Sequence, residues 1–354
     1  MSDDLFSKLF ELFNQPGPVN WKLAAEVARH LSGERQPIEP WASEEFRELA
    51  RLAEYRLEAV APFPVRPATD VLPLDPRSWA EKNLEMYGSL VEPFAASMGG
   101  GEAAPMMAQL APAMIGLQVG SLVGSLSAWV VAGFDAGLPP DLTGPLTLVV
   151  PNIETLSVTG VDPREVHLWV VANEVAFRAV CDVPWIDDHL AGLLAEYAAA
   201  TSIDPTKLSG LMIGGTDPAA IEKAIEDAGG IDGLIGGEEA EAPRAELEAF
   251  LGVITGCARL LARRAISEMA PNFDEISSVR DEEREEITAT PTIGVGPVPP
   301  EATQLGDAFN QEVERRYGDD ALQSLWSDPT RMPTASELRD PTAWAARVLL
   351  DGWT

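Results

Sequence analysis

The feature that most constrains the fold is a long stretch without charge, because residues 103–134 contain no charged side chain. Such a stretch can cross a bilayer, so a membrane-associated protein is one interpretation. Prolines and polar residues interrupt it, and no basic cluster flanks it. We therefore predict a fully buried central helix and no membrane span. Gly116, Gly120 and Gly124 recur at every fourth residue and predict close approach of a neighbouring helix.

The charge balance excludes one large class of partner. The chain has 25 Lys+Arg against 56 Asp+Glu and a formal net charge of −31. This charge repels nucleic-acid phosphates and anionic lipid headgroups, so we expect no nucleic-acid partner. Cys181 and Cys257 make no disulfide framework. The N-terminal segment lacks a basic region followed by an apolar core, so we expect a cytoplasmic protein.

Helical periodicity dominates the sequence and predicts a mainly α fold with a small β component. Asn20 and Asp162 are positioned to cap two of the helices. The apolar run from Leu146 to Val150 lies between prolines and predicts a short strand. The predicted helices span 3–13, 20–32, 42–60, 78–97, 163–182, a segment after Trp185 to about Ala200, 203–213, 217–228, 244–270, 304–317, 319–326 and 341–350.

Proline, glycine and charge divide the chain further. The proline-rich residues 61–78 predict an extended connection, and residues 288–303 predict a linker. The acidic run 281–286 is typical of a solvated helix face. We expect two lobes flanking a cleft, 1–200 and 201–354, with the long helix 244–270 in the second lobe.

The segment 151–190 carries a family resemblance. It contains Pro151-Asn152-Ile153, Val161-Asp162-Pro163-Arg164, Leu168-Trp169-Val170 and Val183-Pro184-Trp185. With GPVNW at 17–21, Gly116 to Gly120 and the C-terminal Leu325-Trp326, these residues resemble zinc-dependent metalloproteases of the zincin-like type. That family is common in actinobacteria and some archaea. The resemblance spans almost the whole chain and implies a zincin-like helical fold with a small sheet.

The resemblance also implies a zinc motif that this chain has lost. In an H-E-x-x-H helix, two imidazoles one turn apart bind Zn²⁺, and the glutamate acts as general base on the metal-bound water. Here Asn173 and Phe177 occupy the ligand positions, and Glu174 occupies the general-base position. Thr255 aligns with the family's third ligand, a glutamate on the long helix. No metal ligand therefore remains, and we expect no cofactor where the family binds zinc.

Other residues could compensate for the missing zinc ligands in two ways. Glu174 in a shielded cleft would have a raised pKa unless it is paired, and Arg178 or Arg259 could neutralise it. Alternatively, His189, Cys257 and Glu174 could rebuild a zinc site. His167 lies seven residues before Glu174, so one ion cannot be chelated directly by both without a bend in the helix.

Two functions follow from this sequence. The first is a catalytically inactive homologue of zinc-dependent metalloproteases that acts by binding a protein or peptide partner. The alternative is an active hydrolase or metallopeptidase with a non-standard metal site. In the first case Glu174 is vestigial, and in the second it still acts in catalysis.

Overall fold

Two polar residues start helices where the sequence predicts them. Asn20 precedes α2 (Trp21–Leu31), and its side-chain oxygen accepts a hydrogen bond from the backbone N–H of Leu23. Asp162 precedes α8 (Pro163–Cys181) and accepts from the N–H of Arg164. Each cap satisfies an N–H that has no partner inside its own helix. Both predicted helices are therefore confirmed.

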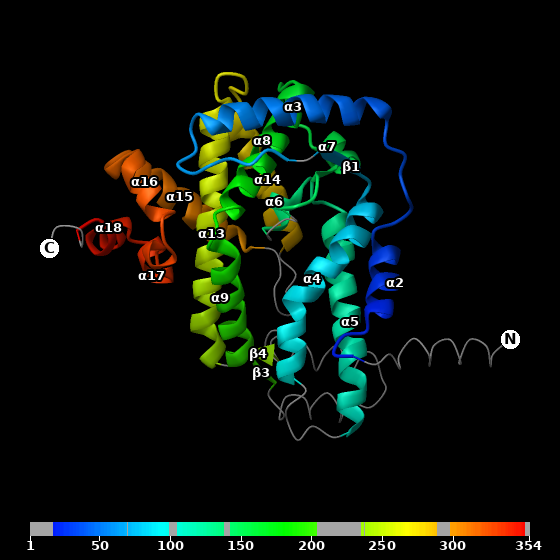
Figure 1. Ribbon diagram of the computed structural model, residues 1–354. Coiled ribbons are helices and arrows are strands. Elements are labelled where there is room, and N and C mark those ends of the chain that lie inside the picture. Colours follow the sequence, from blue (N-terminus) through cyan, green and yellow to red (C-terminus); the bar gives the residue numbers. More distant parts are fainter. Residues whose placement is uncertain are drawn as a thin grey trace.

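The computed structural model describes residues 17–68, 70–98, 105–137, 142–203, 235–236, 238–288 and 298–350, and most of them are helical (Figure 1). The predicted helices 3–13 and 217–228, and all of 203–213 except Ile203, lie outside these residues. The remaining long helices are α3 (Pro40–Glu58), α4 (Pro76–Met98), α5 (Pro105–Ser127), α9 (Ile186–Ala200), α13 (Glu238–Ile266), α14 (Phe273–Thr288), α15 (Pro300–Tyr317) and α18 (Pro341–Leu350). The short helical elements are α6 (Gly133–Ala136), α7 (Val150–Thr155), α16 (Asp319–Leu325), a 3-10 turn (Pro329–Arg331) and α17 (Ala335–Leu338). The prediction of a mainly helical protein with a small sheet is confirmed.

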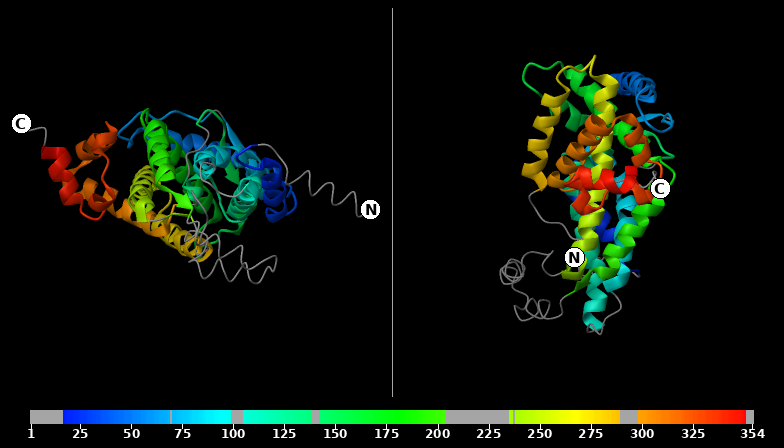
Figure 2. Two further views of the ribbon diagram at one scale, coloured as in Figure 1. Left: turned by 90° about the horizontal axis from the view of Figure 1, so that it is seen from below. Right: turned by 90° about the vertical axis from the view of Figure 1, so that its left-hand side faces the viewer.

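The centre of the molecule is α8, which packs against α13, α3 and α7. Every residue from Val166 to Cys181 is buried, so this helix presents no solvent face. The helix α13 packs in turn along α9 and α15. The elements α15 to α18 form one end of the molecule, and α2, α4 and α5 form the other (Figures 1 and 2). The division into lobes 1–200 and 201–354 stays a prediction.

The glycines of α5 allow α2 to pack very closely, as the sequence predicts. A Cβ added at Gly116 would lie 2.4 Å from the carbonyl oxygen of Asn20, and one at Gly120 would lie 2.4 Å from that of Ala24. No side chain fits at such distances. The prediction that α5 is fully buried is wrong, because Leu117 on another face is 48 % exposed. None of the helices in the described ranges combines the length and the apolar character needed to cross a membrane.

The sheet next to α8 is a parallel pair of strands. The predicted strand appears as β2 (Leu146–Val149), and it pairs with β1 (Val71–Leu74), which lies in the predicted extended connection. The isolated bridge between Ala132 and Leu148 adds a short extended segment before α6. A second pair, β3 (Ser202–Ile203) with β4 (Ile235–Gly236), is antiparallel. The first pair anchors the segment 128–136, which is important for the site described below.

Two expectations about polar segments need correction. The acidic run 281–286 belongs to α14, but Arg284 in its middle is only 3 % exposed, so the run is not a uniformly solvated face. The predicted linker 288–303 overlaps two helices, because α14 extends to Thr288 and α15 begins at Pro300. Its residues 289–297 lie outside the described part of the chain.

Candidate functional site

Three of the four residues singled out in the sequence lie on α8, and the fourth lies on the helix packed along it. Asn173, Glu174 and Phe177 are on α8 and are 3 %, 0 % and 1 % exposed. Thr255 is on α13 and is also buried. Burial of α8 on every side explains why all of these side chains are shielded from solvent.

The polar groups at the predicted ligand positions are engaged by their own helices. The side-chain amide of Asn173 donates to the carbonyl oxygen of Trp169 at 2.8 Å. The hydroxyl of Thr255 donates to the carbonyl oxygen of Leu251 at 2.9 Å. Phe177 is one of the largest fully buried side chains of the described residues. The volume between these helices is therefore occupied by apolar atoms and by polar groups with local partners.

Glu174 is used differently, because it reaches across to another segment. Its Oε2 accepts a hydrogen bond from the backbone N–H of Phe134, at 2.8 Å, in the first turn of α6. A Cβ added at Gly133 would lie 3.1 Å from Oε1, which is a tight contact that would require the carboxylate to shift slightly. The carboxyl group thus holds the start of α6, where backbone N–H groups favour a negative charge.

The surroundings of Glu174 shift its titration strongly. Burial raises the pKa of Glu174 to about 7, and the nearby charge of Asp135 also raises it. The N–H groups of Phe134 and Gly133 and the charge of Arg178 act in the opposite direction. Its Oε1 is buried and finds no hydrogen-bond partner among the described residues. A carboxyl group with such a pKa changes its protonation state near neutral pH.

The two arginines proposed to neutralise Glu174 have other partners. The guanidinium of Arg259 binds both carboxylate oxygens of Asp281 at 2.7 Å, so its proposed pairing with Glu174 is wrong. The guanidinium of Arg178 donates to the carbonyl oxygens of Leu142 and Gly144, each at 3.1 Å. Arg178 lowers the pKa of Glu174 through its charge, but burial remains the larger effect.

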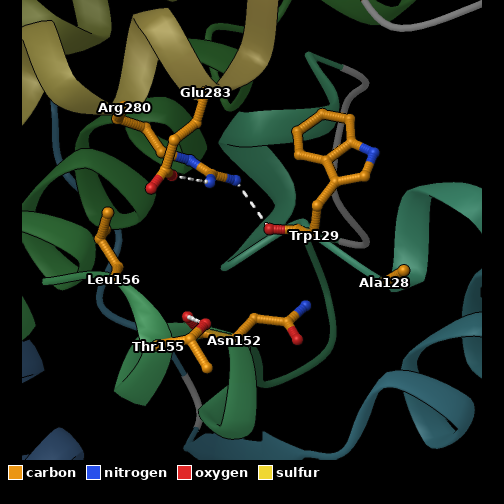
Figure 3. Close-up of a pocket in the computed structure, with 7 residues that line it drawn as sticks. All are labelled: Ala128, Trp129, Asn152, Thr155, Leu156, Arg280 and Glu283. Carbon is orange, nitrogen blue, oxygen red and sulfur yellow. Dashed lines mark hydrogen bonds and ion pairs between the residues drawn. The ribbon is translucent and has the colours of Figure 1, made fainter. Parts of the chain in front are cut away.

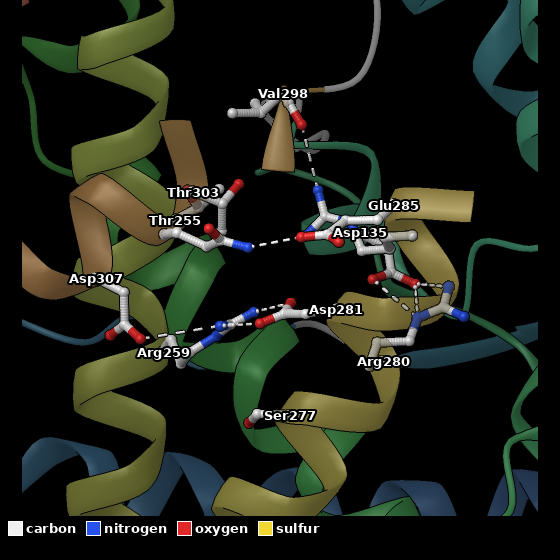
Figure 4. Close-up of polar contacts among 12 residues, drawn as sticks. Asp135, Thr255, Arg259, Ser277, Arg280, Asp281, Glu285, Val298, Thr303 and Asp307 are labelled. Carbon is white, nitrogen blue, oxygen red and sulfur yellow. Dashed lines mark hydrogen bonds and ion pairs between the residues drawn. The ribbon is translucent and has the colours of Figure 1, made fainter. Parts of the chain in front are cut away.

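A buried network of charges lies beside the site, and the sequence analysis did not find it. Arg280 on α14 binds Asp135 with Nε and Nη2 (Figure 4). It also donates to the backbone carbonyl oxygen of Trp129 at 2.7 Å. Asp135 is fully buried and also accepts from the N–H of Val131 at 3.0 Å. A signal existed, because Asp135 is the first charge after the uncharged stretch 103–134.

The histidines and cysteines do not complete a metal site. His189 packs against aromatic rings, 4.8 Å from that of Phe250 between centroids. His167 binds Glu45 at 3.1 Å and Glu154 at 3.0 Å through its two ring nitrogens. Cys257 is buried, and burial raises the pKa of its thiol. Within the described ranges, no three His, Cys, Asp or Glu side chains gather in a way that could hold a metal ion.

Comparison with known proteins places this arrangement in a family. The model of the zincin-like metallopeptidase family matches residues 19–345. The chain belongs to this family. A solved structure from Chloroflexus aurantiacus, described as "a putative hydrolase with a novel fold", superposes with a TM-score of 0.66 at 20% sequence identity. The match covers 93% of this chain and 98% of that chain, which supports the fold. No curated protein matches the sequence.

Within the zincin-like metallopeptidase family, the donor set of this chain does not fit zinc. Zinc in proteins is bound by thiolate, imidazole and carboxylate groups. Asn173 and Thr255 offer only neutral oxygens, which are poor ligands for this ion, and Phe177 offers no donor atom. The two carboxylates on α8 are both engaged, because Glu165 accepts from the N–H of Asn272 and Glu174 accepts from the N–H of Phe134 through its Oε2. We therefore derive no reaction step through a metal at these positions.

Proposed function

We propose that this protein is a non-catalytic member of the zincin-like metallopeptidase family that acts by binding a protein or peptide partner. One observation carries the proposal: the ligand positions Asn173, Phe177 and Thr255 hold side chains that are buried and satisfied within their own helices. Rebuilding a zinc centre there would require new side chains, because the present ones lack suitable donors. The scaffold around them is retained, as the family match over 19–345 shows.

A second candidate function is a hydrolase that uses Glu174 without the family's zinc ligands. The observation in its favour is the pKa of about 7 for Glu174, since a general acid or base works best near the operating pH. Against it stands the burial of this side chain, which is 0 % exposed and therefore does not reach a substrate in this conformation.

Peptidase activity and metal content distinguish the two functions. We expect no hydrolysis of fluorescently labelled casein by the purified protein, with or without added Zn²⁺. We also expect no stoichiometric zinc by elemental analysis after a mild chelator wash, and an unchanged thermal midpoint in strong chelator. Casein hydrolysis that disappears in the Glu174→Gln variant would establish the hydrolase instead. About one zinc per chain after washing would show that the ligand set has been misassigned.

A further inference from the structure

A pocket of about 230 Å³ lies beside the charge network, between α7, α14 and the segment after α5 (Figure 3). Its lining includes Trp129, Asn152, Thr155, Arg280 and Glu283. This volume lies below the roughly 300–1,000 Å³ of sites for drug-sized ligands, so the pocket suits a single side chain.

The side-chain donors of Asn152 and Thr155 in the pocket wall are already engaged. Both side-chain N–H groups of Asn152 are used, on the carbonyl oxygens of Ser127 at 2.9 Å and Val130 at 2.8 Å. Since an amide has two N–H donors, the amide oxygen of Asn152 is the atom left to bind a ligand. The hydroxyl of Thr155 donates to the backbone carbonyl oxygen of Asn152 at 2.8 Å and keeps its lone pairs.

The charged residues that line the pocket are Arg280 and Glu283. The guanidinium of Arg280 binds Asp135 behind the wall and also donates to Glu283 at 2.8 Å. The charge of Arg280 is therefore compensated by carboxylates on both sides. Glu283 keeps a second oxygen, and its side chain is 42 % exposed at the mouth of the pocket. The charge of the whole chain, −31, adds to the attraction of a cation.

From these contacts we infer that the pocket takes the ammonium group of a lysine side chain on a protein or peptide partner. An ammonium has three donors and no acceptor, which matches the oxygens of Glu283, Asn152 and Thr155. The apolar atoms of Leu156, Ala128 and Trp129 provide contact for the four-carbon stem. This inference rests on the proposed partner-binding function and identifies the chemistry of the partner.

The vestigial catalytic residue contributes to the pocket indirectly. Ala128 and Trp129 line the pocket, and their segment, residues 128–136, is held from three helices, by Asn152 of α7, Arg280 of α14 and Glu174 of α8. Glu174 is therefore a positioning residue for this wall. It does not line the pocket itself.

Ligand-observed NMR titration of the full chain tests the inference with three blocked tripeptides, Ac-Ala-Lys-Ala-NH₂ and its norleucine and glutamate counterparts. We expect the lysine peptide to bind with a Kd on the order of 1 mM, as is reasonable for one side chain. The norleucine and glutamate peptides are expected to bind at least about tenfold more weakly, since they lack a charge-assisted donor. Equal binding of norleucine would show an apolar pocket, and preference for glutamate would show an anion site at Arg280. Either result overturns the inference.

Two variants with the same loss of charge localise the binding. Glu283→Gln should weaken the lysine peptide about tenfold, because it removes the carboxylate at the pocket mouth. Glu282→Gln removes the same charge from an exposed position outside the pocket lining and should leave the affinity unchanged. Equal effects of both variants, or no binding of any peptide up to about 20 mM, would overturn the inference. The casein and zinc measurements remain independent of these outcomes, so failure of the pocket is distinguishable from failure of the non-catalytic function.

Discussion

Two buried polar clusters among the described residues pair their polar groups in opposite ways. One forms hydrogen bonds within single helices, and the other forms ion pairs between different elements. At the predicted ligand positions, Asn173 and Thr255 are neutral and bind carbonyl oxygens of their own helices. Next to them, Asp135 and Arg280 keep full charges and pair between different elements. Substitutions in the first cluster should change the free energy of unfolding only slightly, since each contact is local. The second is sensitive, because removing either partner leaves a buried charge without its buried counter-charge.

Glu174 shares features with both clusters. It is buried like the neutral residues, yet it binds the Phe134 N–H of α6, next to Asp135. In an active zincin-like site such a glutamate would face a metal-bound water. Here the hydrogen bond that it accepts from the Phe134 N–H holds the backbone at the start of α6. Glu174 therefore belongs with the contacts between elements, although it lies at the predicted general-base position of the zinc motif.

The largest effect is expected when the charged cluster is broken. Asp135→Asn keeps the shape of the side chain but leaves Arg280 without its buried counter-charge. We expect the free energy of unfolding to fall by about 3–5 kcal/mol. Urea denaturation followed by circular dichroism measures this loss. A loss below about 1 kcal/mol would show that Glu283 and the Trp129 carbonyl can compensate the charge.

A second prediction converts the neutral cluster back into a charged one. The triple variant Asn173→His, Phe177→His and Thr255→Glu places two imidazoles at i and i+4 on α8 and a carboxylate on α13. Zinc at about 100-fold excess over its Kd should then raise the free energy of unfolding by about 2.7 kcal/mol relative to the metal-free variant.

Calorimetric titration of zinc into the folded variants is the measurement for this prediction. Truncation of a buried Phe costs about 3–5 kcal/mol, so folding of the triple variant is verified first. Asn173→His alone is the control and should bind zinc far more weakly, because its ligand set is incomplete. A folded triple variant that binds no more tightly than the parent would show that the alignment at Thr255 is wrong.

A third prediction concerns pH. The pKa of Glu174 is raised to about 7 in the folded state, against an ordinary value of 4.5. The folded state therefore holds this proton more tightly than the unfolded state does. The associated stability is fully present below about pH 4.5 and is lost as the pH rises through about 7.

Glu174→Gln cannot ionise, so it should lose less stability than the parent between pH 5 and pH 8. We expect the difference between the two pH profiles to reach about 2 kcal/mol in favour of the variant at pH 8. Thermal unfolding of both proteins across this range provides the comparison. Parallel profiles would mean that Glu174 titrates near its ordinary value.

The smallest effect is expected for Thr255→Val, which removes a hydroxyl but keeps the branched shape. The hydroxyl donates to carbonyl oxygens inside α13, whose backbone bonds remain. We expect the free energy of unfolding to change by less than about 1 kcal/mol. This variant is the matched contrast to Asp135→Asn. A large loss in the same urea experiment would mean that Thr255 has a partner beyond its own helix.

The sequence predicts the local features of this fold well. Asn20 and Asp162 cap their helices because a cap depends on a few neighbouring residues. The glycine spacing in α5 correctly predicts close packing, since i, i+4 and i+8 lie on one face. The strand β1 was missed because the prolines around Val71–Leu74 obscure an alternating pattern.

The partners of buried charges are harder to predict. Arg280 and Arg284 lie in or beside an acidic run whose composition is typical of a solvated face, yet both are buried. Which face of α14 packs inward depends on Asp135, a residue far away in the sequence. For the same reason, the sequence could nominate Arg178 and Arg259 as partners of Glu174 but could not assign their real contacts. The roles of the four residues in the former zinc motif remain predictions.

The parallel pairing of β1 with β2 has a consequence for the order of assembly. The helices α4, α5 and α6 separate the two strands in the chain, so their pairing closes a very long loop. Such long-range contacts form slowly, because chain entropy is lost before any contact rewards it. Segment 128–136 depends on this event, since the N–H of Val149 binds the carbonyl oxygen of Val131. In pulse-labelling hydrogen exchange during refolding, the Leu146 amide, which donates to the carbonyl oxygen of Asp70 next to β1, should gain protection after the amides of α8, and simultaneous protection would contradict this order. The pocket wall would then be completed late in folding, after the scaffold that carries it.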